Sequence, residues 1–147
     1  MVNEEILQKY PVIYTGEFAI IHDMSNDYPG LAYGFWCGFF KLSNPKFIQE
    51  MQDSIDLIKK HNIKIYLSDH SLLKVVSEDV IDWLHDNWYQ EASKNGLQFE
   101  ISLNSKSAIT NMSLKKMLDN DKTGGVVTIG VPSIEEGIRV SKEYLLQ

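Results

Sequence analysis

Apolar and polar positions along the chain fall into short blocks whose spacing predicts an α/β protein. Six apolar blocks have the length and composition of β-strands, and they occupy residues 10–14, 18–22, 31–40, 63–69, 99–103 and 126–131. Four other blocks repeat apolar residues every three to four positions, as amphipathic helices do, at residues 43–62, 77–96, 105–120 and 133–145. After the first three strands, the chain therefore alternates helices with strands.

Capping residues mark the predicted helix boundaries. Ser43 or Asn44 precedes the first long helix, and Ser77 precedes the second; their side chains can accept hydrogen bonds from unpaired backbone N–H groups. Gly96 stands where the second helix should end, because glycine adopts the left-handed backbone of a helix terminus. Ser133 opens a capping box at the last helix. These signals predict where three of the helices begin and where the second one ends.

The predicted order of elements is β-β-β-α-β-α-β-α-β-α, and it determines how the strands can pair. Short connections join the first three strands, so we expect these to pair antiparallel. Helices separate the later strands and act as right-handed crossovers between parallel strands. The apolar run in residues 63–69 suits a central strand covered on both faces. A mixed sheet follows, in one domain spanning residues 1–147, with residues 1–9 as a loose lead-in.

Several packing features of the chain resemble those of a known family. They are Trp36-Cys37-Gly38, a strand that ends in Asp69, and Trp88 followed by Ala92, Gly96 and Leu97. Together with the element order, they are similar to small stand-alone bacterial proteins with the STAS fold, the SpoIIAA-like fold of anti-sigma-factor antagonists. The resemblance covers the chain from about residue 18 onward. It implies a STAS-like α/β fold.

One departure from this family concerns a regulatory serine. Antagonists of the phospho-switch type carry an Asp-Ser-Ser-Gly-like segment at the start of the helix that follows the central strand. The matching segment here is Val76-Ser77-Glu78-Asp79, which has a serine but no glycine. The flanking acids oppose an added phosphate. We therefore interpret Ser77 as a helix cap whose hydroxyl accepts a backbone N–H, with phosphorylation as the alternative.

Polar residues follow two neighbouring strands where a ligand cleft would form. Asp69, His70 and Ser71 follow the fourth strand, and Asn104 and Ser105 follow the fifth. Open α/β sheets bind ligands at the carboxyl ends of their parallel strands. These five residues are candidate ligand-binding residues. The alternative is that they are loop residues that satisfy helix N-termini.

The second helix also carries a weak candidate for a metal site. Asp82, His85 and Asp86 share its polar face and could supply oxygen and nitrogen ligands. The helix lacks the HExxH pattern, so a solvated polar face is the preferred interpretation. The chain has no GxSxG elbow, phosphate-binding loop, CxxC pair or dinucleotide fingerprint. We therefore assign no catalytic residue and expect no cofactor or metal.

Aromatic residues gather around the third strand. Alternation places Tyr33 and Phe35 on one face and Trp36 on the other, with Phe39 further along. One face must belong to the core, and the other needs a helix or a second subunit to cover it. Because aromatics are enriched at buried interface centres, all four are candidate interface residues, with core packing as the alternative.

Composition narrows the classes of partner and compartment. The net charge is −6 without a long basic run, which disfavours nucleic-acid binding. Cys37 is the single cysteine, so an intramolecular disulfide is excluded and a cytoplasmic location is expected. The start of the chain lacks a signal-peptide pattern. The apolar block at residues 31–40 is shorter than the about 20 residues that span a bilayer, so we expect no membrane insertion.

Three functions are compatible with these observations. The first is a non-enzymatic regulatory or protein-interaction module that binds a protein partner or forms a homodimer. The second is a small-ligand-binding domain that uses the strand-end cleft. The third is an enzyme with His70 or His85 as general base, and it ranks last because no nucleophile accompanies either histidine.

Overall fold

The computed structural model describes residues 8–145, so residues 1–7 of the predicted lead-in lie outside the described residues. The strands are β1 (Val12–Thr15), β2 (Ala19–Asp23), β3 (Leu31–Trp36), β4 (Ile65–Asp69), β5 (Phe99–Leu103) and β6 (Val127–Val131). The helical elements are α2 (Pro45–Lys60), α3 (Glu78–Trp83), the π-helical turn η1 (Leu84–Trp88), α4 (Tyr89–Lys94), α5 (Ala108–Met117) and α6 (Ile134–Leu145). The predicted order of strands and helices is confirmed.

The described strands form one six-stranded sheet in chain order, from β1 to β6. β1, β2 and β3 pair antiparallel, whereas β3, β4, β5 and β6 pair parallel. Both pairing modes were predicted from the lengths of the connections. β4 lies between β3 and β5, and each of its residues is buried, as expected for a strand covered on both faces.

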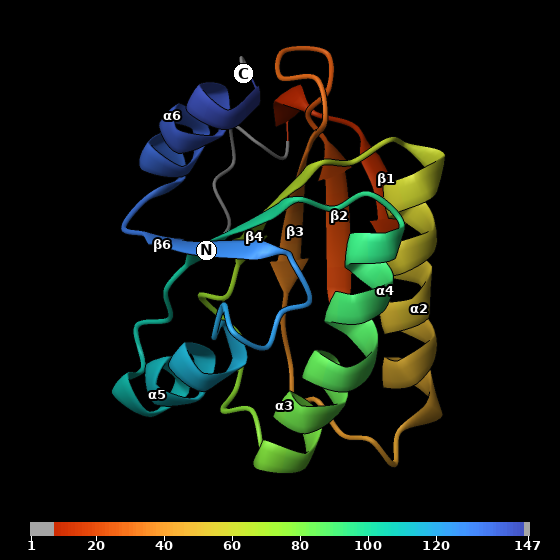
Figure 1. The fold of residues 1–147 in the computed structure, drawn as a ribbon, viewed down its shortest axis with the longest axis vertical. Coiled ribbons are helices and arrows are strands. Elements are labelled where there is room, and N and C mark those ends of the chain that lie inside the picture. Colours follow the sequence, from red (N-terminus) through yellow and green to blue (C-terminus); the bar gives the residue numbers. More distant parts are fainter. Residues whose placement is uncertain (1–7, 146–147) are drawn as a thin grey trace.

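Helices cover both faces of this sheet (Figure 1). α2, the α3–η1–α4 segment and α5 pack on one face, while α6 packs on the other against β4, β5 and β6. Gly137 allows α6 to approach closely: a Cβ at this position would lie 2.6 Å from Cδ1 of Leu67. The result is two hydrophobic clusters, one on each side of the sheet.

The third strand is shorter than predicted. It ends at Trp36, not at residue 40, because Gly38 has a φ of +84° that a strand cannot continue through. Gly38 instead forms an isolated parallel bridge to Leu73. The chain beyond β3 therefore turns toward the loop that follows β4, and Phe39 lies outside the sheet.

The helix termini follow the capping pattern with one correction. Asn44 accepts a hydrogen bond from Lys46 N, and Ser133 accepts one from Glu136 N. Gly96 ends α4 with a φ of +111°. Ser77 occupies the N-cap position of α3, but its hydroxyl donates to Asp79 and accepts no backbone N–H. Its hydrogen is donated to a charged acceptor, which makes this a charge-assisted hydrogen bond within the first turn of the helix.

The open edge of β6 is partly closed by its own chain. The backbone N–H of Thr128 donates to Oδ1 of Asn120 over 2.7 Å, and its carbonyl accepts from Nδ2 of the same side chain over 3.3 Å. This amide takes the place of a neighbouring strand, which blunts an edge that could otherwise pair with another chain. Within residues 8–145, no helix has the length and apolar character needed to cross a bilayer.

Candidate functional site

A chain of buried polar side chains runs between the sheet and the helices on its broadly covered face. Glu100 of β5 is 3% exposed, and its carboxylate accepts hydrogen bonds from Tyr89 (2.5 Å) and Ser68 (2.7 Å). The Ser68 hydroxyl in turn accepts from Nε1 of Trp36 over 3.0 Å. A buried carboxylate with no cationic partner in this set needs such donors to remain in the core.

The same layer contains a second polar group centred on Ser54 of α2. Its hydroxyl accepts from Nε1 of Trp88 over 3.0 Å and donates to the carbonyl of Met51. The backbone carbonyl of Ser54 accepts from the Tyr66 hydroxyl over 2.7 Å. We call the two groups together the polar seam; its members are Trp36, Ser54, Tyr66, Ser68, Trp88, Tyr89 and Glu100.

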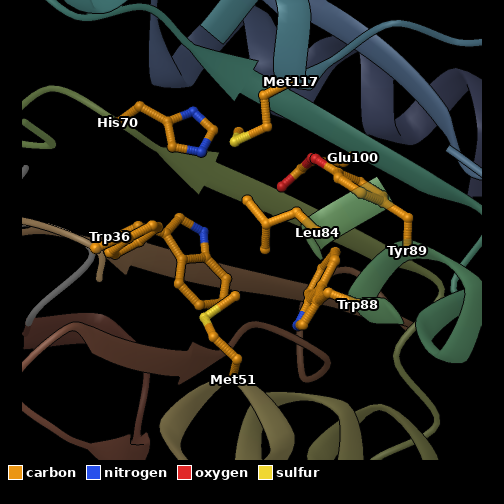
Figure 2. Close-up of a pocket in the computed structure, with 9 residues that line it drawn as sticks. Trp36, Met51, His70, Leu84, Trp88, Tyr89, Glu100 and Met117 are labelled. Carbon is orange, nitrogen blue, oxygen red and sulfur yellow. The ribbon is translucent and has the colours of Figure 1, made fainter. Parts of the chain in front are cut away.

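The polar seam borders a small cavity of about 20 Å³. Figure 2 shows the side chains that line it, among them Trp36, Trp88, Glu100, His70 and Met117. A cavity of this size accommodates about one water molecule. The cavity is too small for an organic ligand.

The π-helical turn η1 changes which side chains of the α3–η1–α4 segment face the sheet. The N–H of Tyr89 bonds to the carbonyl of Leu84, five residues earlier. Buried residues along the segment recur every four positions, at Val80, Leu84, Trp88 and Ala92. In a regular α-helix each such step overshoots one turn by about 40°, so the wider turn returns Trp88 to the sheet. Such insertions frequently occur at functional sites.

His70 extends the polar layer toward the strand ends. Its Nδ1 lies 2.8 Å from the hydroxyl of Ser102, and the side chain is 2% exposed. Burial lowers the pKa of His70 to about 4, although the neighbouring Asp69 charge opposes this shift. Burial also raises the pKa of the Glu100 carboxyl, against the effect of its hydrogen bonds from Tyr89 and Ser68. Burial therefore shifts the titration of both groups toward their uncharged forms.

The five candidate ligand-binding residues do not converge on one cleft. Asp69 points to the face that α6 covers, where it accepts a hydrogen bond from the Tyr33 hydroxyl and another from the backbone of Ser71. His70 points to the opposite face, because consecutive residues at a strand end alternate in direction. Asn104 is exposed. Of the five residues, Ser71 and Ser105 line the same groove at the surface.

This groove, which we call the strand-end groove, is an open depression of about 760 Å³ at the carboxyl ends of β4 and β5. Its walls are formed by Phe39, residues 71–75, residues 105–107, Ile109 and Thr110. Several of its apolar side chains face solvent: Phe39 is 45% exposed, Leu72 54%, Val75 42% and Ile109 67%. Clustered exposure of large apolar side chains is the usual mark of an interaction surface.

Two serines of the strand-end groove are engaged differently. The Ser105 hydroxyl accepts from the backbone of Ser107 over 3.0 Å. The Ser71 hydroxyl oxygen is buried and has no hydrogen-bond partner among the described residues. The alternative interpretation was that these residues satisfy helix N-termini. Ser105 does bond to the N-cap residue of α5, whereas Asp69 bonds to the backbone of Ser71 in a loop.

Three of the four candidate interface residues lie in the core. Tyr33 and Phe35 belong to the cluster under α6, and Trp36 belongs to the cluster on the other face. Each is at most 7% exposed, so the interface interpretation is corrected for these three. Helices from both sides cover the strand and leave no room for a second subunit there. Phe39 alone is exposed, in the strand-end groove.

The candidate metal ligands of the second helix diverge. His85 is 6% exposed, and its Nε2 donates to the carbonyl of Met117 over 2.8 Å, so this nitrogen is not available to a metal. Asp82 and Asp86 are exposed. Among residues 8–145, no group of three or more His, Cys, Asp or Glu side chains could hold a metal ion.

Comparison with known proteins identifies the fold. No family model matches the chain, and no curated protein matches its sequence. Among solved structures, a serine-to-glutamate variant of RsbS from Moorella thermoacetica matches with a TM-score of 0.54 at 19% identity, over 95% of this chain and 99% of that one. The chain has a STAS-like fold. At this identity the similarity establishes the fold alone, and it confirms the resemblance expected from the packing residues.

Sequence reasoning missed the polar seam, although one signal for it was present in α2, and the pattern of β5 was misleading. Ser54 interrupts the apolar stripe of α2 at a spacing of three and four residues from Met51 and Ile58, which places a hydroxyl in the core. Glu100 alternates with apolar neighbours in β5, which normally indicates a solvent-facing residue. Because helices cover both faces of the sheet, the same alternation here directs a carboxylate inward.

Proposed function

We propose that this chain is a non-enzymatic protein-interaction module that binds a partner protein in its strand-end groove. The observation that carries the proposal is the exposure of Phe39, Leu72, Val75 and Ile109 within one depression. Burying these side chains against a partner would remove apolar surface from water, which is the main driving force of most protein association. The STAS-like fold supports this proposal, because anti-sigma-factor antagonists, which have the same fold, act on other proteins.

An enzymatic role has less support from the geometry. His70 is buried and its pKa of about 4 makes it a weak base near neutral pH, and His85 is buried with its Nε2 hydrogen donated to the carbonyl of Met117. The small-ligand alternative has weaker support, since the side chains of Asp69 and His70 point to opposite faces of the sheet and, of the five candidate residues, Ser71 and Ser105 line the groove. The strand-end groove remains the strongest candidate for binding.

Phosphorylation of Ser77 would take place two residues beyond Val75, the last residue of the 71–75 segment that lines the groove. Ser77 is exposed, but its hydroxyl donates to Asp79, and a phosphate would face that carboxylate and the adjacent Glu78. Intact-mass measurement on protein purified from its native host tests this directly. A mass increase of one phosphate that maps to Ser77 would make the groove a phosphorylation-controlled surface.

The test of the proposed function compares exposed apolar residues inside the groove with one outside it. In affinity purification from the native host, the double variant Leu72→Ser, Ile109→Ser should lose a partner that the unchanged chain retains. Val127→Ser is the matched control, because Val127 is 43% exposed on β6, away from the groove. The partner is then purified, and its affinity for all three chains is measured by calorimetry. Equal affinity for the groove variant and the control would refute the proposal.

A further inference from the structure

The strand-end groove differs in charge from the rest of the chain. The whole chain has a net charge of −6, whereas the described residues lining the groove include Lys74 and Lys106 and no acidic residue. Neither lysine lies within salt-bridge distance of a carboxylate among residues 8–145. Lys41 adds a third positive charge nearby, with its ammonium 5.6 Å from the Phe39 ring centroid. Positive charges thus lie within and beside a groove whose exposed large side chains are apolar.

Acidic side chains close to the groove are engaged by other groups of the chain. Asp69 is buried and accepts hydrogen bonds from the Tyr33 hydroxyl and from the backbone of Ser71, which lines the groove. Glu78 forms an ion pair with Lys116 at 2.9 Å, and Asp79 accepts the hydrogen bond from Ser77. Both lie on α3, outside the lining of the groove. Carboxylates of an incoming partner would therefore meet Lys74 and Lys106 without competition from within the groove.

The start of α5 contributes positive potential on the same wall. Ser107 is its N-cap residue, and the first turn of this helix contains no acidic side chain. The N-terminus of a helix carries a partial positive charge, which acidic residues in the first turn normally offset. Here that charge adds to the field of Lys106, because Ser107 and Ile109 also line the groove.

The backbone around the groove favours a helical occupant over an extended strand. The loop after β4 is already paired with the segment after β3, since Gly38 bridges to Leu73 and Lys74 N donates to the carbonyl of Gly38 over 3.1 Å. Strand addition requires a free row of backbone groups, and this pairing occupies those between the two segments. An amphipathic helix needs only an apolar groove for its side chains.

We infer that the occupant of the strand-end groove is an amphipathic helix of a partner protein, with an apolar face flanked by acidic residues. The inference rests on the proposed function and specifies its partner. The apolar face packs on Phe39, Leu72, Val75 and Ile109, and the acidic flanks approach Lys74 and Lys106. Charge complementarity of this kind sets partner choice and orientation.

The test uses two fluorescein-labelled helical peptides of about 18 residues, or five turns, with the same leucine face. One carries glutamate on both flanks of that face, and the other carries lysine. Fluorescence anisotropy measures binding of each peptide to the full chain. The glutamate peptide should bind more tightly. The double variant Lys74→Glu, Lys106→Glu should weaken its binding by about tenfold, the equivalent of about 1.4 kcal/mol, and should favour the lysine peptide instead.

The matched control is Lys59→Glu, Lys60→Glu, which reverses two exposed charges at the end of α2 and outside the groove. It should leave both affinities within about twofold, a change of less than 0.5 kcal/mol by the same conversion. Circular dichroism melting verifies that each variant is folded. Should charge reversal unfold the chain, Lys74→Gln with Lys106→Gln replaces it and should also reduce the preference for glutamate.

Equal binding of the two peptides, or an unchanged preference after charge reversal, would overturn the assignment of an acidic helix. The proposed function would still stand if the native partner bound the unchanged chain and failed to bind the Leu72→Ser, Ile109→Ser variant. A second copy of this chain is the competing occupant. It would appear in light scattering as a dimer that this groove variant abolishes, and that result would also overturn the acidic-helix assignment.

Discussion

The polar seam and the strand-end groove invert the usual distribution of side chains in opposite ways. The polar seam places Glu100, Ser68 and Ser54 inside the protein, whereas the groove leaves Leu72 and Ile109 facing water. Buried polar groups and clustered exposed apolar groups are the informative departures from the general rule that apolar residues lie inside. The two regions meet in one loop, because His70 borders the cavity beside the seam while Ser71 lines the groove.

The difference between the regions concerns what holds each of them in place. Side chains of the polar seam are connected by several hydrogen bonds, so a change at one residue leaves other buried groups unsatisfied. Apolar side chains of the groove extend into solvent and stabilise the monomer little. We therefore expect changes in the seam to affect folding, and changes in the groove to affect binding.

The sharpest test of this comparison truncates one side chain in each region. Trp88→Ala should lower the free energy of unfolding by about 4 kcal/mol, because it removes a buried ring and a hydrogen bond to Ser54. Ile109→Ala should change it by less than about 0.5 kcal/mol, because the side chain is 67% exposed. Urea denaturation followed by far-ultraviolet circular dichroism measures both. Similar losses for the two variants would remove the distinction between the regions.

His70 should make the protein sensitive to acid. Its folded pKa of about 4 lies below its ordinary value of 6.5, so the stability contributed by the neutral imidazole is complete above pH 6.5 and is lost as the pH falls toward 4. At pH 4 the loss should be about 3 kcal/mol. His70→Asn keeps a polar group for Ser102 and does not titrate. If the unfolding free energies of the two proteins change in parallel from pH 8 to pH 4, His70 is not the source.

Glu100 should act at the other end of the pH scale. Its folded pKa is raised above the ordinary value of 4.5, so the contribution of the protonated form is present below pH 4.5 and is lost as the pH rises through the raised value. Relative to Glu100→Gln, the unchanged protein should lose stability with a limiting slope of about 1.4 kcal/mol per pH unit. Denaturation curves collected between pH 4 and 9 provide the measurement, and a constant difference between the proteins contradicts the prediction.

Ser71 offers the smallest effect, at the junction of the two regions. Its hydroxyl oxygen is buried without a partner among the described residues, so Ser71→Ala should raise the free energy of unfolding by about 1 kcal/mol. The hydrogen bond from its backbone N–H to Asp69 is retained. Ser105→Ala is the matched control and should destabilise the protein, because that hydroxyl accepts from Ser107. Thermal melting compares the two changes.

The features that sequence patterns predicted well depend on local physics. Asn44 and Gly96 mark helix ends because capping involves only neighbouring backbone groups, and the structure places both at those ends. The lengths of the connections determined which strands pair antiparallel. The end of β3 was missed because Gly38 turns the chain toward Leu73, a partner distant in sequence. A run of apolar residues carries no information about such a contact.

The candidate site was less predictable, because it depends on which face of a strand is covered. Periodicity correctly placed Tyr33 and Trp36 on opposite faces of β3, but it could not show that helices bury both. The same uncertainty hid the inward direction of Glu100. The adjacency of Asp69 and His70 suggested one cleft, whereas alternation at the strand end sends their side chains to opposite faces.

The sequence by itself determined the order of the elements, the helix termini and the mixed pairing of the strands, because these follow from short-range sterics, capping and connection length. Tertiary structure alone decided that Glu100 lies inside and that Phe39, Leu72 and Ile109 gather in one groove. Burial is a property of what packs on a residue, and the packing neighbours are distant in the chain. Glu100 is held by Ser68 of β4 and Tyr89 of α4, and the groove combines α5 with the segments that follow β3 and β4.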